Sequence, residues 1–216
     1  MKRLLIVCEG PTEQDFCNTL LCEHLAKYDV NVSAPLIKKS NGGIVSWESI
    51  RSQIINHLCE KNAIVTMFID YYGIQERHKF PGWGESKGIS DKANRIHFLI
   101  DKMREDVPDN LRYRFIPYLQ LHEFESLLFS DGVAYKEIFA PEEADIDEIE
   151  LVIEQFSTPE DINDSPDTAP SKRLIKAIPT YNKIVYGNII AEQIGLQAIR
   201  QKCPLFNEWL ILLENL

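Results

Sequence analysis

The stretch Leu4-Leu5-Ile6-Val7-Cys8 is followed at once by Glu9-Gly10-Pro11-Thr12-Glu13, and this change of character decides how the chain begins to fold. The apolar run predicts a buried strand over residues 3–8. In the second stretch the glycine permits a tight turn, the proline suits the first turn of a helix, and the threonine or the last glutamate can bind exposed helix N–H groups. We therefore expect a strand that ends at Glu9 and a helix over residues 12–28.

Similar alternations of strand and helix follow along the chain. The expected elements are a strand over 30–37, a turn at Asn41-Gly42-Gly43, a helix over 45–59, and strands over 63–69 and 113–121 separated by a helix over 90–106. This order predicts an α/β fold with a mostly parallel four-stranded sheet flanked by helices, followed by a helical C-terminal part. In such sheets the ligand crevice lies outside the carboxyl ends of the strands.

Length and composition indicate an ordinary globular protein, because 44% of the 216 residues are hydrophobic and 26% are charged. We expect an α/β core over 1–130, an acidic insertion or lid over 131–170, and a helical part over 171–216 packed on the core in one compact body. No apolar run approaches the ~20 residues that span a bilayer, so we expect a cytoplasmic protein that binds no membrane. The five cysteines lack a zinc-type CxxC pair and are interpreted as buried thiols.

The formal net charge of -10 is concentrated in one segment. Residues 137–167 contain 12 acidic side chains and no lysine or arginine, which leaves 21 acidic and 23 basic residues in the rest of the chain. The distribution of charge matters more for partners than its sum, so nucleic-acid binding is compatible with this composition. The acidic segment is interpreted as a lid, an insertion or a surface for a partner.

Carboxylates stand where three of the expected strands end. They are Glu9, Asp70, and Glu123 or Glu125. Hard oxygen ligands with few histidines favour Mg2+ or Mn2+ over zinc, and such an ion stabilises charge while a phosphodiester is attacked. A carboxylate outside the metal shell can relay a proton.

Each of these side chains also has a structural interpretation. Glu9 can cap the following helix, Asp70 can anchor a turn, and Glu123 or Glu125 can face solvent at the start of a helix, where negative charge is favourable. His122 is interpreted as a hydrogen-bonded structural residue rather than a catalytic base.

Two basic groups are candidates for contacts with nucleic acid or phosphate. Arg77 and Lys79 lie in a loop over residues 73–89 that also carries aromatic side chains for stacking on a base. Lys172 and Arg173 follow a probable helix start, where they can approach phosphate. The alternative for both groups is a solvated basic surface.

Several motifs together resemble a known group of proteins. They are CEGPTE, IDYYG, HEFESLLF, TAPSKRL and GLQAIRQKCPLFNEWL, which begin at Cys8, Ile69, His122, Thr168 and Gly195. They resemble an uncharacterised prokaryotic TOPRIM-like family, a domain of unknown function that is distantly similar to the TOPRIM domains of OLD-family nucleases, topoisomerases and primases. The resemblance spans nearly the whole chain.

The resemblance implies roles for two residues. Glu9 matches the TOPRIM glutamate, which relays a proton or contacts metal, and Asp70 matches the first aspartate of the Asp-x-Asp metal motif. Tyr72 stands where the second aspartate is expected. A complete metal site then requires an oxygen from Glu123 or Glu125.

Two functions follow as expectations. The first is a Mg2+-dependent nuclease or related phosphoryl-transfer enzyme that acts on nucleic acid with a partner ATPase, as in TOPRIM-containing phage-defence systems. The second is a non-catalytic TOPRIM-like module that binds a protein partner through its acidic segment. The sequence distinguishes neither DNA from RNA nor one oligomeric state from another.

Overall fold

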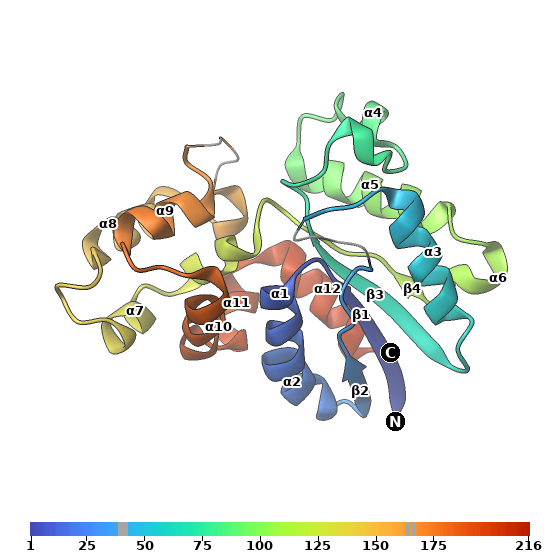
Figure 1. Cartoon of the computed structure of the whole chain (residues 1–216), viewed down its shortest axis with the longest axis horizontal. Coiled ribbons are helices and arrows are strands. Elements are labelled where there is room, and N and C mark those ends of the chain that lie inside the picture. The colour runs from blue at the N-terminus through green and yellow to red at the C-terminus, as the bar shows by residue number, and fades with distance from the viewer. Residues whose placement is uncertain (39–42, 163–164, 166) are drawn as a thin grey trace. The chain divides into compact units, whose positions relative to one another are not determined.

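The chain divides into two compact units. A computed structural model describes residues 1–38, 43–162, 165 and 167–216 (Figure 1), and its first unit comprises Met1–Leu121 with Leu212–Leu216, whereas the second comprises His122–Ile211. The unit boundary therefore falls at Leu121, nine residues before the end of the core expected from composition. Most of the expected turn Asn41-Gly42-Gly43 lies outside the described residues.

A parallel sheet forms the centre of the first unit. Its strands among the described residues are β1 (Lys2–Cys8), β2 (Val30–Ser33), β3 (Ala63–Asp70), β4 (Phe115–Ile116) and β5 (Leu119–Gln120). They are ordered β2-β1-β3-β4, and β5 pairs with the end of β3. Every pairing is parallel, which confirms the expected α/β fold with a mostly parallel sheet flanked by helices.

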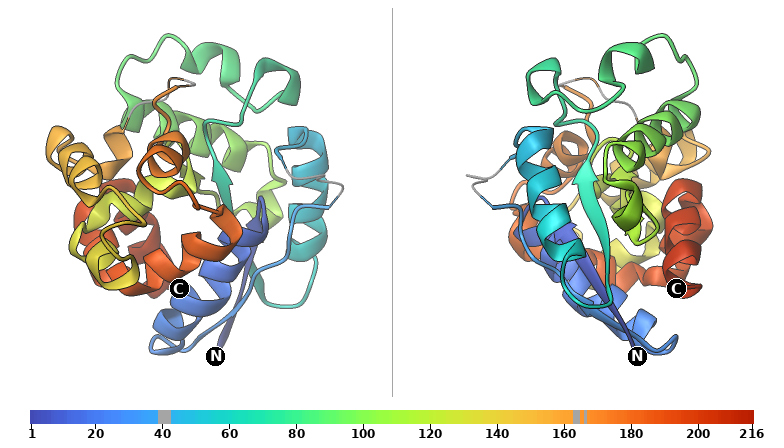
Figure 2. Two further views of the ribbon diagram at one scale, coloured as in Figure 1. Left: turned by 60° about the vertical axis from the view of Figure 1, so that its left-hand side comes forward. Right: turned by 90° about the vertical axis from the view of Figure 1, so that its right-hand side faces the viewer.

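The pairing of β1 with β3 is the longest in the sheet, running from Arg3↔Ala63 to Cys8↔Phe68. Figure 2 shows the dark blue β1 beside the turquoise β3 from two directions. The last five residues of β1 are buried without alternation, as expected for a strand covered on both faces. The strand expected over 113–121 is instead two short strands, because Pro117 lies between them and lacks the N–H that a continuous ladder needs.

Helices cover the sheet of the first unit on two sides (Figure 1). A continuous helical segment follows β1, whereas α3 follows β2 and α5 follows β3. The elements are α1 (Pro11–Phe16), a π-helical turn (Cys17–Leu21), α2 (Cys22–Ala26), α3 (Trp47–Leu58), α5 (Lys92–Glu105) and α6 (Asp109–Arg112). Since the connection from β1 leads to β2 and the connection from β3 leads to β4, the chain leaves these adjacent strands in opposite directions.

The loop over 73–89 is more ordered than the sequence suggests. It contains a 3-10 turn (Glu76–His78) and a short helix α4 (Trp83–Ser86). Phe80 is buried and its ring packs on Trp47, with ring centres 5.5 Å apart. Trp83 packs on Tyr71 at 5.5 Å. These contacts give the aromatic side chains of the loop a packing role.

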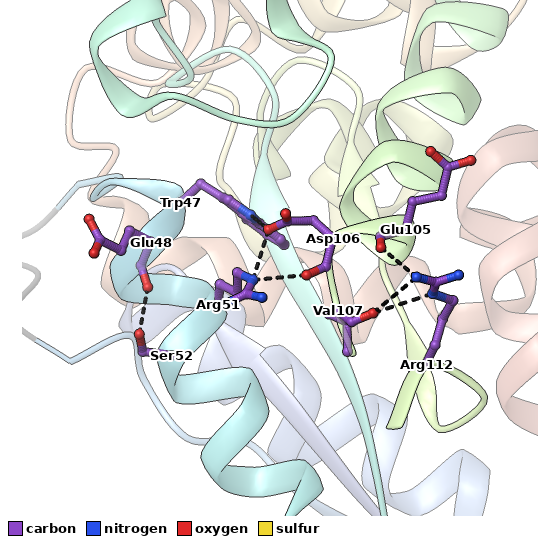
Figure 3. A network of polar contacts seen from close by, with 8 residues as sticks. All are labelled: Trp47, Glu48, Arg51, Ser52, Glu105, Asp106, Val107 and Arg112. Atoms are coloured by element: carbon purple, nitrogen blue, oxygen red, sulfur yellow. Dashed lines mark hydrogen bonds and ion pairs between the residues drawn. The ribbon is translucent and has the colours of Figure 1, made fainter. Parts of the chain in front are cut away.

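One aspartate joins the start of α3 to the end of α5 (Figure 3). Trp47 Nε1 and Arg51 Nε each lie 2.8 Å from Asp106 Oδ2, and Arg51 Nε also donates to the Asp106 carbonyl. In the same region Arg112 donates to the carbonyl oxygens of Glu105 and Val107. Side chains thus bind the carbonyl groups that the end of α5 leaves without helical partners.

The second unit is helical over its described residues, which confirms the expected helical C-terminal part. None of the described helices in the chain is both long and apolar enough to cross a membrane. The elements are a 3-10 helix (Phe124–Ser130), α7 (Val133–Ile138), α8 (Ile146–Gln155), a 3-10 turn (Pro159–Asp161), α9 (Pro170–Ala177), α10 (Lys183–Ile194), α11 (Leu196–Lys202) and α12 (Pro204–Glu214), of which the residues from Leu212 on belong to the first unit.

A buried carboxylate binds the start of α12. Glu160 is 2% exposed and accepts hydrogen bonds from the amides of Leu205 and Phe206 at 3.0 and 2.9 Å. Burial raises the pKa of Glu160 to about 7, outweighing the two backbone N–H groups that lower it. The folded chain therefore holds a proton at this residue across a pH range in which the unfolded chain releases it.

Glu160 is expected to make the second unit less stable as pH rises. With the pKa near 7 when folded and 4.5 when unfolded, the free energy of unfolding should fall between those pH values by up to about 3 kcal/mol from this residue. Urea unfolding of the wild type and Glu160→Gln at pH 4.5 and pH 8 measures the difference. A pH dependence of equal slope in the two proteins would contradict this assignment.

Candidate functional site

The side chain of Glu9 contacts the end of the neighbouring strand β3. Its Oε2 accepts a hydrogen bond from the amide of Asp70 at 3.1 Å, and its own amide donates to the Phe68 carbonyl at 3.2 Å. Two carboxylate-bearing residues thus stand side by side at the carboxyl ends of two paired strands. Asp70 is 8% exposed and Glu9 is half-buried, so the pair is only partly shielded from water.

This pair lies where the sheet reverses the direction of its connections. The helix after β1 leads to β2 on one side, and the segment after β3 leads to β4 and β5 on the other. In open α/β sheets the crevice that binds ligands forms at such a switch point, outside the carboxyl ends of the strands. The expected position of Glu9 and Asp70 at strand ends is therefore met by the structure.

Glu13 is a third acidic side chain of this region, and the sequence interpretation gave it only a capping role. It is 2% exposed, and a Cβ added at Gly10 would stand 3.0 Å from its Oε2. The absence of a side chain at Gly10 thus leaves room for this carboxylate. The sequence feature that could have indicated Glu13 as part of this region is its position four residues after Glu9, across a predicted helix start.

Two buried thiols lie beneath this turn. Cys8 Sγ is 3.7 Å from Cys17 Sγ, and both residues have no exposed surface. Burial raises the pKa of the Cys17 thiol, and Cys8 and then the Glu13 carboxylate raise it further. The Cys17 thiol is therefore a neutral packing group. The expectation of buried thiols is confirmed for Cys8, Cys17 and Cys203 but is wrong for Cys59, which is exposed, and Cys22 is partly exposed.

The segment after Asp70 passes close to Glu9. A Cβ added at Gly73 would be 3.7 Å from Glu9 Oε1, so the chain passes close to the carboxylate. The Tyr71 hydroxyl accepts a hydrogen bond from Arg95 at 3.4 Å. Tyr72 is 36% exposed.

Glu123 and Glu125 belong to the second unit, where each has a partner. Glu123 Oε2 accepts a hydrogen bond from the amide of Ser171 at 3.0 Å, near the start of α9. Glu125 is 1% exposed and its Oε2 lies 3.3 Å from Lys183 Nζ. The structural alternative, in which one of these side chains faces solvent at the start of a helix, does not fit Glu125, which is buried, and Glu123 instead binds the start of a different helix.

The Glu123 contact joins two of the motifs on which the family resemblance rests. HEFESLLF contains Glu123, and TAPSKRL contains Ser171. Burial raises the pKa of the Tyr181 phenol, and the charges of Glu125, Tyr135 and Glu123 raise it further. His122 is buried with a positive φ of 69°, an uncommon conformation for a residue other than glycine.

The four basic candidates fall in two different units. Arg77 is exposed, and its Nε lies 3.2 Å from Nε2 of buried His78, whose pKa is lowered by burial and by the Arg77 charge. Lys79 is exposed with a φ of 55°.

In the second unit Lys172 is exposed on α9, whereas Arg173 donates to the Thr168 carbonyl at 2.8 Å and lies over the Phe156 ring.

No three histidine, cysteine, aspartate or glutamate side chains form a group that could hold a metal ion among residues 1–38, 43–162, 165 and 167–216. The pair Glu9 and Asp70 provides two carboxylates of the hard-oxygen type that Mg2+ prefers. The expected contribution of Glu123 or Glu125 to a metal site stays a prediction.

Comparison with protein families gives a match over most of the chain. The model of a domain of unknown function, DUF4276, matches residues 8–214. The chain belongs to this family. The match begins at Cys8, immediately before Glu9, and includes Asp70 and the motifs quoted above. Neither a curated protein nor a solved structure matches the chain.

Glu123→Ala is expected to destabilise the second unit by about 1–2 kcal/mol, because the Ser171 amide at the start of α9 loses its carboxylate acceptor. Glu123→Gln, which keeps an oxygen acceptor, should cost less. Urea unfolding followed by circular dichroism compares the two variants with the wild type. If Glu123→Ala lowers the free energy of unfolding no more than Glu123→Gln does, then Glu123 does not stabilise α9.

Proposed function

We propose that this protein is a nuclease or related phosphoryl-transfer enzyme that uses Mg2+ or Mn2+ and acts on nucleic acid. The observation that carries the proposal is the 3.1 Å hydrogen bond from the Asp70 amide to Glu9 Oε2 at the switch point of the sheet. It fixes one carboxylate beside a second carboxylate-bearing residue at the position where α/β sheets bind their ligands.

The two residues fit the proposed ion by their chemistry. Mg2+ is commonly bound by one or two carboxylates, with water and substrate phosphate completing its shell. When bound, the ion would supply stabilisation of the negative charge that develops during attack on a phosphodiester. Asp70, the more buried of the two, would serve as the fixed ligand. Glu9, which is half-buried, would contact the ion or exchange a proton with water.

The proposal includes a TOPRIM-like core and a partner. The CEGPTE and IDYYG motifs support the first point, since they supply Glu9 and Asp70 at the ends of β1 and β3. The scattered basic groups support the second. Arg77 and Lys79 lie in one unit and Lys172 and Arg173 in the other, and Arg173 already binds the Thr168 carbonyl, so neither unit brings all four candidate cations to a polyanion. A partner ATPase, as in TOPRIM-containing phage-defence systems, would supply additional contacts.

Cleavage of plasmid DNA and of RNA tests this function directly. Purified protein, with and without an ATPase encoded beside it, should cleave one of these substrates only when Mg2+ or Mn2+ is added. Glu9→Gln is expected to lower the rate by about 100-fold or more, because it removes a proton-transfer or metal-binding group. Glu48→Gln makes the same chemical change at an exposed side chain of α3 and should leave the cleavage rate unchanged. Equal rates in the three proteins, or no cleavage by any, would overturn the nuclease proposal.

A second candidate function is a non-catalytic module that binds a protein partner through its acidic segment. Tyr72 favours it, since this residue replaces a potential ligand with a half-exposed phenol. In that case Glu9 and Asp70 would serve the stability of the sheet end alone.

Titration calorimetry with Mg2+ discriminates the two functions. If the ion binds at the sheet, Asp70→Asn should weaken binding by about tenfold or more, since a charged oxygen ligand becomes a neutral amide. Melting curves of both proteins show whether the variant is folded. Equal heats in the wild type and the variant would favour the non-catalytic module.

A further inference from the structure

A groove in the second unit lies within the acidic segment. It has a volume of about 680 Å3, within the range of roughly 300–1,000 Å3 typical of binding pockets. Its walls come from α7, from the connection between α7 and α8, from the start of α8, and from the end of α9 with the residues that follow it. The lining residues are Lys136, Pro141, Glu142, Glu143, Ala144, Asp145, Ile146, Asp147, Lys176, Ala177 and Pro179.

The charged side chains of the groove are mostly acidic. Glu142, Glu143, Asp145 and Asp147 are all exposed, and none forms an ion pair with a lysine or arginine in the part of the chain that the structure describes. The groove therefore has four carboxylates that form no ion pair among the described residues, although the charge of Asp147 acts on Lys136. Such a concentration of negative charge favours a cationic partner.

The two lysines of the groove do not cancel this charge. Lys136 pairs with Glu150 at 2.5 Å, and Lys176 pairs with Glu148 at 2.6 Å. Neither glutamate is among the lining residues, so each lysine is compensated by a carboxylate from outside the groove. The pKa of Lys136 is raised by the Glu150 contact, and then by the charges of Glu150 and Asp147, which keeps its ammonium group charged and paired.

The groove also has apolar lining and a rigid frame. Its apolar residues include Ala144, Ile146 and Ala177. The Asp145 amide donates to the Ala177 carbonyl at 2.8 Å, which joins the start of α8 to the end of α9, and Asp145 Oδ1 accepts from the amide of Glu148. These bonds hold the groove in shape without a ligand, which lowers the entropic cost of binding.

We propose that this groove binds a basic segment of a partner protein in which arginine or lysine alternates with apolar side chains. In an extended segment successive side chains point to opposite sides, so the cations can reach the carboxylates while the apolar groups enter the groove. The inference deepens the second function proposed above, on which it rests, because it gives the partner of the acidic segment a chemistry and a place. It requires neither Glu9 nor a metal ion.

The binding test uses the full chain labelled with nitrogen-15 and a synthetic peptide of four Arg-Leu repeats. Amide shifts in the NMR spectrum are expected at 136, 142–147 and 176–178, because Pro141 and Pro179 have no amide proton. A peptide of four Glu-Leu repeats, or spermine at equal concentration, should shift these amides far less. If spermine shifts them as strongly as the Arg-Leu peptide, the groove recognises cations rather than a peptide and the proposal is overturned.

Charge reversal locates the contact. The double variant Glu142→Lys, Asp147→Lys is expected to bind the Arg-Leu peptide about tenfold more weakly, because two attractive charge interactions become repulsive. Neither side chain accepts a backbone hydrogen bond among those identified in the described residues, and melting curves confirm folding. Glu154→Lys with Glu192→Lys makes the same charge change at exposed positions outside the groove and should alter affinity by less than about twofold.

The outcomes separate the groove from the wider function. One outcome is that amide shifts occur only in other parts of residues 137–167 and that both double variants bind the peptide with equal affinity. This outcome would overturn the proposal that the groove binds the peptide, but it would leave the acidic segment as a protein-binding surface. No shift with the Arg-Leu peptide anywhere in that segment would count against the groove and the segment together.

Discussion

The parallel pairing of β1 with β3 is the constraint on which the first unit depends. Six residue pairs, from Arg3↔Ala63 to Cys8↔Phe68, fix the register. One more residue along each strand brings the chain to Glu9 and Ile69, and the Glu9 side chain then reaches the amide of Asp70. A slip of one residue would turn the buried side chains of β1 to the opposite face and would also break this contact. The same pairing thus determines the core and the candidate site.

The sequence predicts the parts of the fold that rest on local apolar patterns. The strands ending at Glu9 and Asp70 are found because their apolar runs are long and stop at polar residues. Their adjacency requires a sheet order that the sequence only suggests. The strand expected over 113–121 was broken at Pro117, where the missing N–H outweighs the apolar residues on either side. The ordered structure of the aromatic loop depends on partners such as Trp47, far away in sequence.

Prediction of the site was limited in a similar way. Position in sequence indicates that a carboxylate ends a strand, but it does not indicate which amide or ammonium group that carboxylate will contact. Glu123 binds the amide of Ser171 and Glu125 pairs with Lys183, each at a long separation in sequence. Glu160 resembles the other glutamates of the acidic segment, yet it is buried against α12. In the second unit Glu123 and Glu160 thus each bind backbone amides at the start of a helix that is distant in sequence.

The place of Glu9 at the end of a buried strand affects how a ligand would be bound. A binding site on a loop usually becomes ordered only when the ligand binds, and the conformational entropy that the loop then loses weakens the affinity. The Glu9 carboxylate is instead positioned by β1 and held by the Asp70 amide, both of which are in place once the sheet has formed. Whatever binds there meets a carboxylate whose conformational entropy was lost during folding, so that loss does not oppose association.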